Sequence, residues 1–348
     1  MKRLISVALV LGMVLSLGLT GCGQPAPGGD GENSGGEQIT LQYAHPVSED
    51  SNTHRLGLKF KEEVERLSDG AITIQVIPNF SNETSLIESI QAGDVAFTLT
   101  SAAPIVSFQP KMAVFDVPFL FKSCETTEET MENVFEVFET DEVKATLDYL
   151  DEANIRGLGY LGLGFRVMAT NKQINTLSDM AGLKIRTMEN KNHIDAWDAL
   201  GANPTPMAYS EVFTAIEQHT IDGQEQPFDI LASGKYYEIL DYATTIDMIF
   251  NTTVFMMSPS VYDSLTDEQK AVIDEAAEIS IKWAREDAIA DVSKNMQILT
   301  DNGMEIQGLS EEEKAKAIEL TAPVEENIRA QIGDEIVDVF KDAVEATY

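Results

Sequence analysis

Hydrophobic positions in the first third of the chain alternate between two periods, which predicts strands and helices in turn. Residues 39–43, 71–77 and 95–100 are apolar runs of strand length, whereas residues 54–67 and 83–91 carry apolar side chains at helical spacing. Such alternation indicates an α/β domain with a largely parallel sheet. Ligands of these sheets bind beyond the carboxyl ends of the strands.

A much longer helix is predicted in the last third of the chain. Thr266 and Gln269 form a capping box, and apolar residues follow at helical spacing as far as Leu299. The helix would be about 50 Å long, whereas a domain of about 100 residues is only about 33 Å across. It should therefore run along two domains. The β-branched run 244–256 predicts a crossing between them, and the apolar run 115–121 a buried core segment.

The N-terminus has the pattern of a secretory signal. Two basic residues precede an apolar run from Leu4 to Leu19, and its roughly 15 apolar residues fall short of the about 20 that span a bilayer. The run ends in Leu-Thr-Gly-Cys at 19–22, which resembles the bacterial lipoprotein box and implies a lipid on Cys22. Cys124 then has no partner in the chain, so we expect neither a disulfide framework nor a cysteine metal site.

Residues 22–38 are rich in Gly, Pro, Ser and acidic residues without an apolar period, as in a flexible tether. The net charge of −34 would become −36 on loss of residues 1–21, which contain Lys2 and Arg3 and no acid. Such a field repels nucleic acid and anionic membrane surfaces. It also repels an anionic ligand, so local cations would be needed to bind one.

Arginines are scarce, and two of the eight, Arg166 and Arg186, lie within or beside apolar runs in the stretch 160–227. A buried arginine must meet a carboxylate, because an unpaired buried charge costs several kcal/mol. Its planar fork matches both oxygens of that group. The carboxylate can belong to a ligand or to one of the 58 acidic residues of the chain, and each arginine alone leaves both alternatives open.

Four motifs in this stretch occur together. They are Gly-Phe-Arg at 164–166, Ser-Asp-Met-Ala-Gly-Leu-Lys-Ile-Arg at 178–186, Leu-Gly-Ala-Asn-Pro-Thr-Pro-Met-Ala-Tyr-Ser-Glu-Val at 200–212 and Asp-Gly-Gln-Glu-Gln-Pro at 222–227. In this order and spacing they resemble the solute-binding proteins of tripartite ATP-independent periplasmic (TRAP) transporters, of the DctP type. The resemblance covers nearly all of the chain after the signal.

The resemblance implies a two-domain clamshell of the periplasmic-binding-protein type, with a long helix spanning both domains. Domain I is expected at 39–163 and 252–291, and domain II at 164–251 and 292–348. It also implies a monomer that acts outside the cytoplasm. The lipid on Cys22 would anchor it to the periplasmic side or outer face of a bacterial membrane, where it serves the small and large TRAP membrane subunits.

The resemblance also implies roles for single residues. Arg186 would clamp the ligand carboxylate, with Arg166 as a second and weaker partner. Tyr209 stands where the family often has Phe, a ring that packs on the carbon face of the ligand. Gln226 stands where the family usually has Asn, and the region around Asn190 resembles members that take sugar acids.

The strand ends add His45, Glu83 and Ser101 as candidate residues at the lip of the site. Glu83 opens a helix, where a carboxylate is also favourable simply for the dipole. The other three histidines are interpreted as surface or loop residues, and no two of the four have the spacing of a helical metal pair.

The competing class is a secreted enzyme, suggested only by the glycine run 157–162, which fits the dinucleotide fingerprint. That fingerprint must open a helix, whereas a strand is predicted next, so the glycines suit a hinge instead. We expect no enzyme, cofactor or metal. A sugar acid such as a hexuronate is the favoured ligand, with a C4-dicarboxylate or sialic acid as alternatives. The binding protein of an ATP-driven importer is the nearest rival.

Overall fold

The computed structural model describes residues 38–348, and its first sheet contains the strands expected near the start of the chain. The strand order is β2-β1-β3-β10-β4. β1 runs parallel to β2 and β3, as predicted, while β10 runs antiparallel to β3 and β4. The bounds are β1 (Ile39–Ala44), β2 (Ile72–Ile77), β3 (Phe97–Ser101), β4 (Arg156–Phe165) and β10 (Phe250–Met257).

A second sheet has the order β11-β9-β5-β8-β6-β7. Its members are β5 (Val167–Thr170), β6 (Lys184–Thr187), β7 (Asn203–Pro206), β8 (Gly223–Gln226), β9 (Tyr242–Thr245) and β11 (Glu305–Gly308). The chain crosses between the sheets from β4 to β5 and again from β9 to β10, so the predicted crossing at 244–256 is confirmed. We call the two parts built on these sheets the first and the second lobe.

Helices cover both sheets. Their bounds are α1 (Asn52–Leu67), α2 (Glu83–Ala92), α3 (Ala102–Ile105), α4 (Thr127–Glu139), α5 (Asp141–Lys144), α6 (Lys191–Ala199), α7 (Tyr209–Glu217), α8 (Phe228–Ser233), α9 (Pro259–Asp263), α10 (Asp267–Asp301), α11 (Glu311–Ile332) and α12 (Asp334–Thr347). Short 3-10 helices are η1 (Pro110–Asp116), η2 (Ala145–Ala153), η3 (Leu177–Met180) and η4 (Tyr236–Glu238). No helix within residues 38–348 is long and apolar enough to span a membrane.

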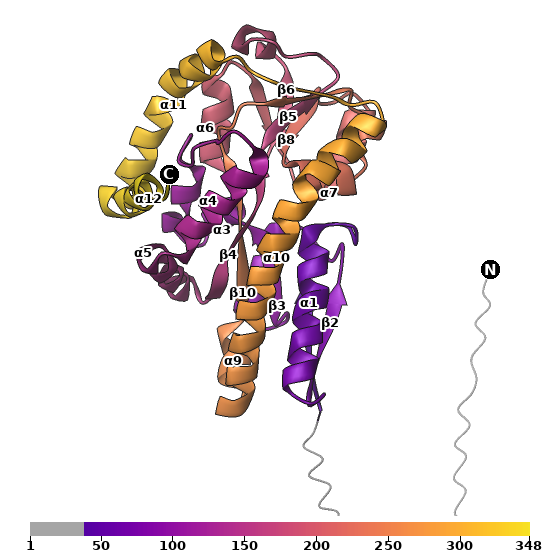
Figure 1. Cartoon of the computed structure of the whole chain (residues 1–348), viewed down its shortest axis with the longest axis vertical. Coiled ribbons are helices and arrows are strands. Elements are labelled where there is room, and N and C mark those ends of the chain that lie inside the picture. Colours follow the sequence, from indigo (N-terminus) through magenta and orange to yellow (C-terminus); the bar gives the residue numbers. More distant parts are fainter. Residues whose placement is uncertain (1–37) are drawn as a thin grey trace, which may run out of the picture. The chain divides into compact units, whose positions relative to one another are not determined.

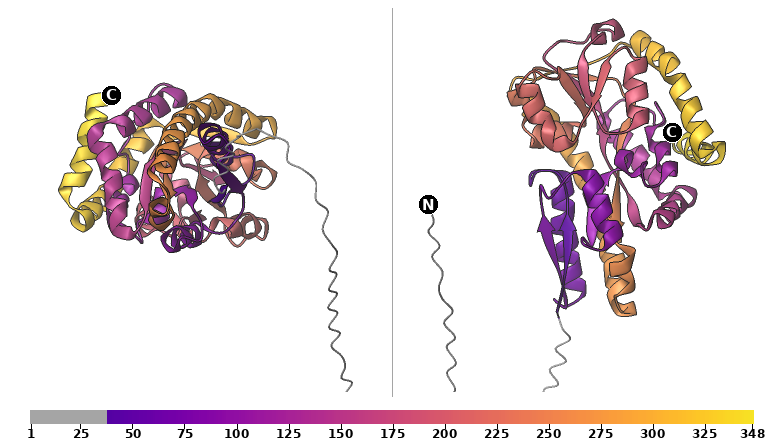
Figure 2. Two further views of the ribbon diagram at one scale, coloured as in Figure 1. Left: turned by 90° about the horizontal axis from the view of Figure 1, so that it is seen from below. Right: turned by 180° about the vertical axis from the view of Figure 1, so that it is seen from behind.

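The long helix α10 confirms the predicted spanning element (Figure 1). It begins at the capping box of Thr266 and Gln269, and it packs against α1, β4 and α4 of the first lobe and α8 of the second. The C-terminal helices also contact both lobes, since α11 packs on α6 and α12 on α4 and α5 (Figure 2). The two-domain α/β clamshell with a spanning helix is therefore confirmed.

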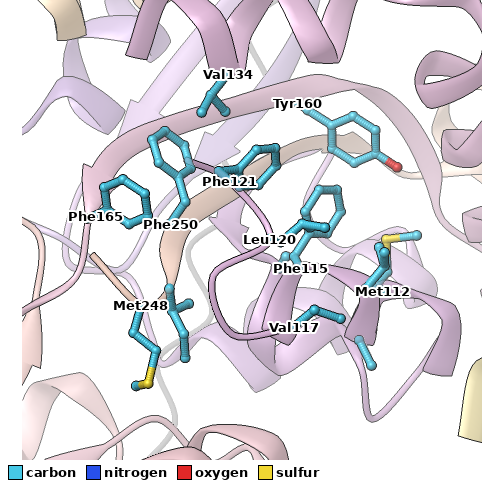
Figure 3. Packing of buried hydrophobic residues seen from close by; sticks show 14 of the residues in the cluster. Met112, Phe115, Val117, Leu120, Phe121, Val134, Tyr160, Phe165, Met248 and Phe250 are labelled. Carbon is cyan, nitrogen blue, oxygen red and sulfur yellow. The ribbon is translucent and has the colours of Figure 1, made fainter. Parts of the chain in front are cut away.

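The glycine run 157–162 lies inside β4, whereas the sequence predicts a strand only after it. Gly162 faces Phe250 of β10, and a Cβ there would come within 2.2 Å of the ring. Phe165, Phe250 and Phe121 pack together where β4 and β10 lie side by side (Figure 3). These glycines permit close packing at the crossing. The predicted buried run 115–121 contributes to the same core, while the predicted signal, Cys22 and almost all of the tether lie outside the described residues.

Candidate ligand-binding site

Arg186 lies in β6 of the second sheet and is almost completely buried, with 2% of its surface exposed. Its Nε and Nη2 atoms both donate to the carbonyl oxygen of Met207, at 2.9 and 2.8 Å. Its Nη1 is buried without a hydrogen-bond partner, and Arg186 forms no salt bridge within residues 38–348. Burial lowers the pKa of Arg186, and the nearby carboxylates of Glu225 and Glu83 oppose that shift.

The hydrogen bonds leave one side of the guanidinium available. Five N–H groups project from its three nitrogens, and Met207 occupies the edge between Nε and Nη2. The remaining edge, between Nη1 and Nη2, also fits a carboxylate through two parallel hydrogen bonds. Because Met207 fixes the orientation of the side chain, this edge is held ready without help from a protein carboxylate.

A cavity of about 40 Å³ adjoins Arg186 between the lobes. The first lobe contributes Thr53, Glu83, Thr100, Ser101 and Thr253, and the second contributes Arg186, Met188, Tyr209, Gln226 and Ile230, among others. The Oγ1 of Thr253 is buried without a hydrogen-bond partner. A second small space that adjoins Arg186 is also lined by Glu83, Met188 and Tyr209. Neutral polar groups from both lobes thus converge next to a single guanidinium.

Glu83 is the first residue of α2 and accepts a hydrogen bond from the backbone N–H of Ser101, at 2.8 Å. Burial raises its pKa, although the Ser101 hydrogen bond and the charge of Arg186 oppose the shift. Asn82 is the N-cap of the helix and accepts a hydrogen bond from the N–H of Ser85, so Glu83 is not the N-cap residue. The carboxyl group belongs to the electrostatic surroundings of Arg186.

Arg166, between β4 and β5, has a different environment. It is equally buried, but its guanidinium forms a salt bridge with Glu225 and a hydrogen bond with the side-chain oxygen of Asn251. Its Nη2 also donates to the Oε1 of Gln226, at 3.1 Å. Arg166 is therefore an internal ion-pair partner, the alternative that the sequence left open, and it orients two residues that line the cavity.

A buried chain of charges continues behind Arg166. His193 of α6 lies between Asp116, at 3.1 Å from its Nε2, and Glu225, at 3.8 Å from its Nδ1. Burial alone would lower the pKa of His193, but the two carboxylates raise it to about 9. Burial would raise the pKa of Glu225, but Arg166 and His193 lower it to about 2. Two cations and two carboxylates thus compensate each other away from solvent.

Besides Arg166, two more candidate residues do not line the cavity. His45 is fully buried, its Nε2 lies 2.9 Å from the Nδ1 of His54, and burial lowers its pKa to about 3. Asn190 is the N-cap of α6, and its Nδ2 donates to Asp116 at 2.8 Å. Both side chains form hydrogen bonds with neighbouring residues of the protein. The interpretation of His193 as a surface or loop residue was wrong, because it is 2% exposed.

Sequence reasoning missed Asn251 and the members of the buried charge chain that continues from Arg166. Asp116 carried a usable signal, because a charged residue inside the apolar run 115–121 must find a partner when it is buried. Glu225 carried a weaker one, as the acid in a short polar strand. His193 and Asn251 had no pattern that distinguishes them from surface residues. No cluster of His, Cys, Asp or Glu in the described chain could hold a metal ion.

Two lobes joined by crossing strands, with an available guanidinium between them, define a solute-binding protein of the clamshell class. The model of the family described as bacterial extracellular solute-binding protein, family 7, matches residues 43–331. A solute-binding protein of Roseobacter denitrificans is 30% identical over 298 residues, which cover 84% of this chain and 89% of that protein.

Solved structures agree. The sugar acid binding protein DctPAm of Advenella mimigardefordensis, in complex with galactonate, has a TM-score of 0.84 and 31% identity, covering 90% of this chain and 99% of that one. A TRAP periplasmic solute-binding protein of Shewanella oneidensis with bound succinate has a TM-score of 0.82 and 28% identity, covering 88% and 99%. This chain belongs to family 7 of the bacterial extracellular solute-binding proteins. It is a TRAP solute-binding protein, which is a transport receptor and not an enzyme.

Proposed function

We propose that the protein captures an organic acid between its lobes and delivers it to the small and large TRAP membrane subunits, which use an ion gradient. The observation that carries this proposal is the Nη1 of Arg186, buried beside the cavity without a partner. An unpaired buried cation is unfavourable unless it meets an anion, so the group suits a ligand carboxylate. The binding protein of an ATP-driven importer is the less favoured alternative.

The surroundings of Arg186 favour a sugar acid. Glu225 already compensates Arg166, so the site offers one cation for one carboxylate, and Glu83 would repel a second. Neutral polar groups such as the unpaired Oγ1 of Thr253 suit hydroxyl groups. The complex of the Advenella relative with galactonate supports this choice, and the Shewanella complex with succinate keeps a C4-dicarboxylate as an alternative beside sialic acid.

In this proposal each lining residue has a task. Arg186 binds the carboxylate, Tyr209 packs against the carbon chain, and Gln226 offers its Nε2 while its Oε1 stays with Arg166. Ser101 and Glu83 line the opposite wall of the cavity, and Asn251 and Thr253 also line the cavity. Arg166, His45 and Asn190 act indirectly, by positioning neighbours.

Entry of a six-carbon acid requires the lobes to separate, because ligand pockets usually measure at least about 300 Å³ and the present cavity about 40 Å³. We place the domain boundaries of this motion near 163/164 and 251/252, with residues 291/292 dividing α10. The protein would act as a monomer, since nothing in the proposal needs a second copy.

The proposed location is the outer surface of the cell membrane, or its periplasmic side, through a lipid on Cys22 after removal of residues 1–21. Residues 22–38 would then form the tether. Replacing Cys22→Ser should release the protein from the membrane fraction. Continued membrane retention of the variant would contradict the proposed lipid anchor. The proposal for the ligand site does not depend on that result.

The ligand proposal is tested by calorimetric titration with galactonate, galacturonate, succinate and sialic acid under one buffer condition. We expect galactonate or galacturonate to bind at least tenfold more tightly than succinate, a difference of about 1.4 kcal/mol. If succinate binds most tightly, a C4-dicarboxylate replaces the sugar acid as the proposed ligand. Binding of none of these acids would contradict the proposed class of ligand.

A further inference from the structure

A second contact between the lobes lies beside the cavity and involves no ligand-lining charge. The first residue of α1, Asn52, donates its backbone N–H to the Oδ1 of Asp229 in α8, at 3.3 Å. Close by, the Oγ of Ser48 donates to the carbonyl oxygen of Ser233, also at 3.3 Å. α1 follows β1 of the first sheet, whereas α8 follows β8 of the second. Ser51 is the N-cap of α1, and the carboxyl group of Asp229 from the opposite lobe adds a second acceptor at this N-terminus.

Asp229 is deeply buried in this contact, with 6% of its surface exposed. Its second oxygen, Oδ2, is buried without a hydrogen-bond partner in residues 38–348. A space of about 10 Å³ adjoins it, lined by Asn52, Leu163 and residues of α10, and this is room for about one water molecule. One carboxyl oxygen therefore has neither a donor nor bulk water when the lobes are in contact.

The charges that face Asp229 come from α1 and α10. Arg55 of α1 lies 2.7 Å from both Asp287 and Asp291 of α10, and the largely exposed Lys294 also contacts Asp291. These two cations compensate the two carboxylates of α10. Among the described residues, Asp229 is the third carboxylate beside these two cations, so one negative charge of the cluster is left over. Closing the lobes therefore brings a carboxyl group into a cluster whose other charges already compensate each other.

We propose that Asp229 is a positioning residue for ligand capture, and that the lobes close most firmly when its carboxyl group carries a proton. The inference rests on the proposed function, because it concerns the closure that traps the ligand. A protonated carboxyl still accepts the Asn52 N–H through Oδ1, and its own O–H can donate to a water in the adjoining space. The charge conflict with Asp287 and Asp291 disappears at the same time.

Linkage gives the direction and size of the effect. In the contact, burial raises the pKa of Asp229 to about 6, Arg55 and the Asn52 N–H oppose the shift, and Asp291 and Asp287 add to it. When the lobes separate, the group returns to water and to an ordinary pKa of about 4. Between these two pKa values the closed arrangement binds more protons than the open one. A falling pH therefore favours closure. Between pH 8 and pH 5 the affinity should rise about tenfold.

The test is calorimetric titration with galactonate and galacturonate at pH 8 and pH 5, at constant ionic strength. Wild type should bind about tenfold more tightly at pH 5. Asp229→Asn keeps the acceptor for Asn52 and removes the charge, so it should bind at pH 8 about tenfold more tightly than wild type does at pH 5, where the open wild-type group must still take up a proton. Asp229→Ala leaves the buried N–H without an acceptor and should bind more weakly at both pH values.

A matched control is Asp263→Asn, which removes one exposed negative charge at the end of α9 and should keep the wild-type pH dependence. Thermal unfolding of each ligand-free variant shows whether it is folded. If Asp229→Asn retains the tenfold pH dependence, the proton resides elsewhere, for example on Glu83, and the inference is wrong.

Failure of the proposed ligand class is a separate outcome. If neither sugar acid binds at any pH, closure of the ligand-free protein is read by small-angle scattering. The inference then predicts a smaller radius of gyration for Asp229→Asn than for wild type at pH 8, and a smaller difference between the two at pH 5. Equal radii at pH 8 would overturn it.

Discussion

The two buried arginines of the second lobe have equal burial and opposite environments. Arg166 meets Glu225, Asn251 and Gln226, and the charge chain continues to His193 and Asp116. Within the described part of the chain, Arg186 donates only to the carbonyl oxygen of Met207, and its Nη1 has no partner. The guanidinium of Arg166 forms an internal ion pair, and that of Arg186 is available for an anion. Burial alone therefore does not identify a ligand-binding arginine; the partners of its N–H groups do.

The largest expected effect is on stability, from Arg166→Ala. The substitution leaves Glu225 buried without its cation, which should cost about 3 to 5 kcal/mol in the free energy of unfolding. Urea unfolding of the ligand-free protein measures it. A double variant, Arg166→Met with Glu225→Gln, removes both charges and should recover most of the loss. Unchanged stability of Arg166→Ala would mean that the ion pair is not structural.

The charge chain also predicts a loss of stability in alkali. Because the folded pKa of His193 is about 9 and its ordinary value is 6.5, its contribution is complete below pH 6.5 and is lost as the pH rises through 9. The loss is on the order of 3 kcal/mol. His193→Gln should lack this decline between pH 7 and 9.5, whereas His219→Gln, on an exposed residue, should retain it. A flat wild-type profile would contradict the protonated His193.

The smallest effect should come from Tyr209→Phe. The ring next to Arg186 packs near Tyr236, with ring centroids 6.3 Å apart, and the substitution keeps that ring. We expect the affinity for galactonate to change by about twofold or less. Tyr209→Ala removes the ring and should cost about 1 to 2 kcal/mol of binding. If Tyr209→Phe and Tyr209→Ala have equal effects, the hydroxyl group of Tyr209, and not its ring, contacts the ligand.

The sequence predicted the parts of this comparison that follow from periodicity and motif. The capping box at Thr266 determines where α10 begins, and the apolar run 244–256 indicates the crossing strand. It did not predict that Glu225 pairs with Arg166, because two charges distant along the chain carry no pairing signal until the fold brings β5 and β8 together. For the same reason His193 was misassigned, since its burial depends on packing of α6 against η1.

The available edge of Arg186 was the least predictable feature. Its orientation depends on one backbone carbonyl, that of Met207, just beyond the end of β7, and no side-chain pattern encodes such a contact. The domain boundaries and the ligand contacts stay predictions at this point. The helix α12 packs on the first lobe, although its residues fall in the stretch expected for the second.

The most direct measurement is of Arg186→Ala, by calorimetric titration with the tightest-binding acid and by unfolding of the ligand-free protein. The account predicts a loss of about 2 to 5 kcal/mol in binding, or roughly 30- to several-thousand-fold, with the apo stability retained. Arg186→Lys should also bind poorly, because an ammonium cannot form two parallel hydrogen bonds. Lys184→Gln, an exposed change in the same strand, should bind normally. Retained affinity together with a destabilised apo protein would contradict the account, and Arg186 would then be structural, as Arg166 is.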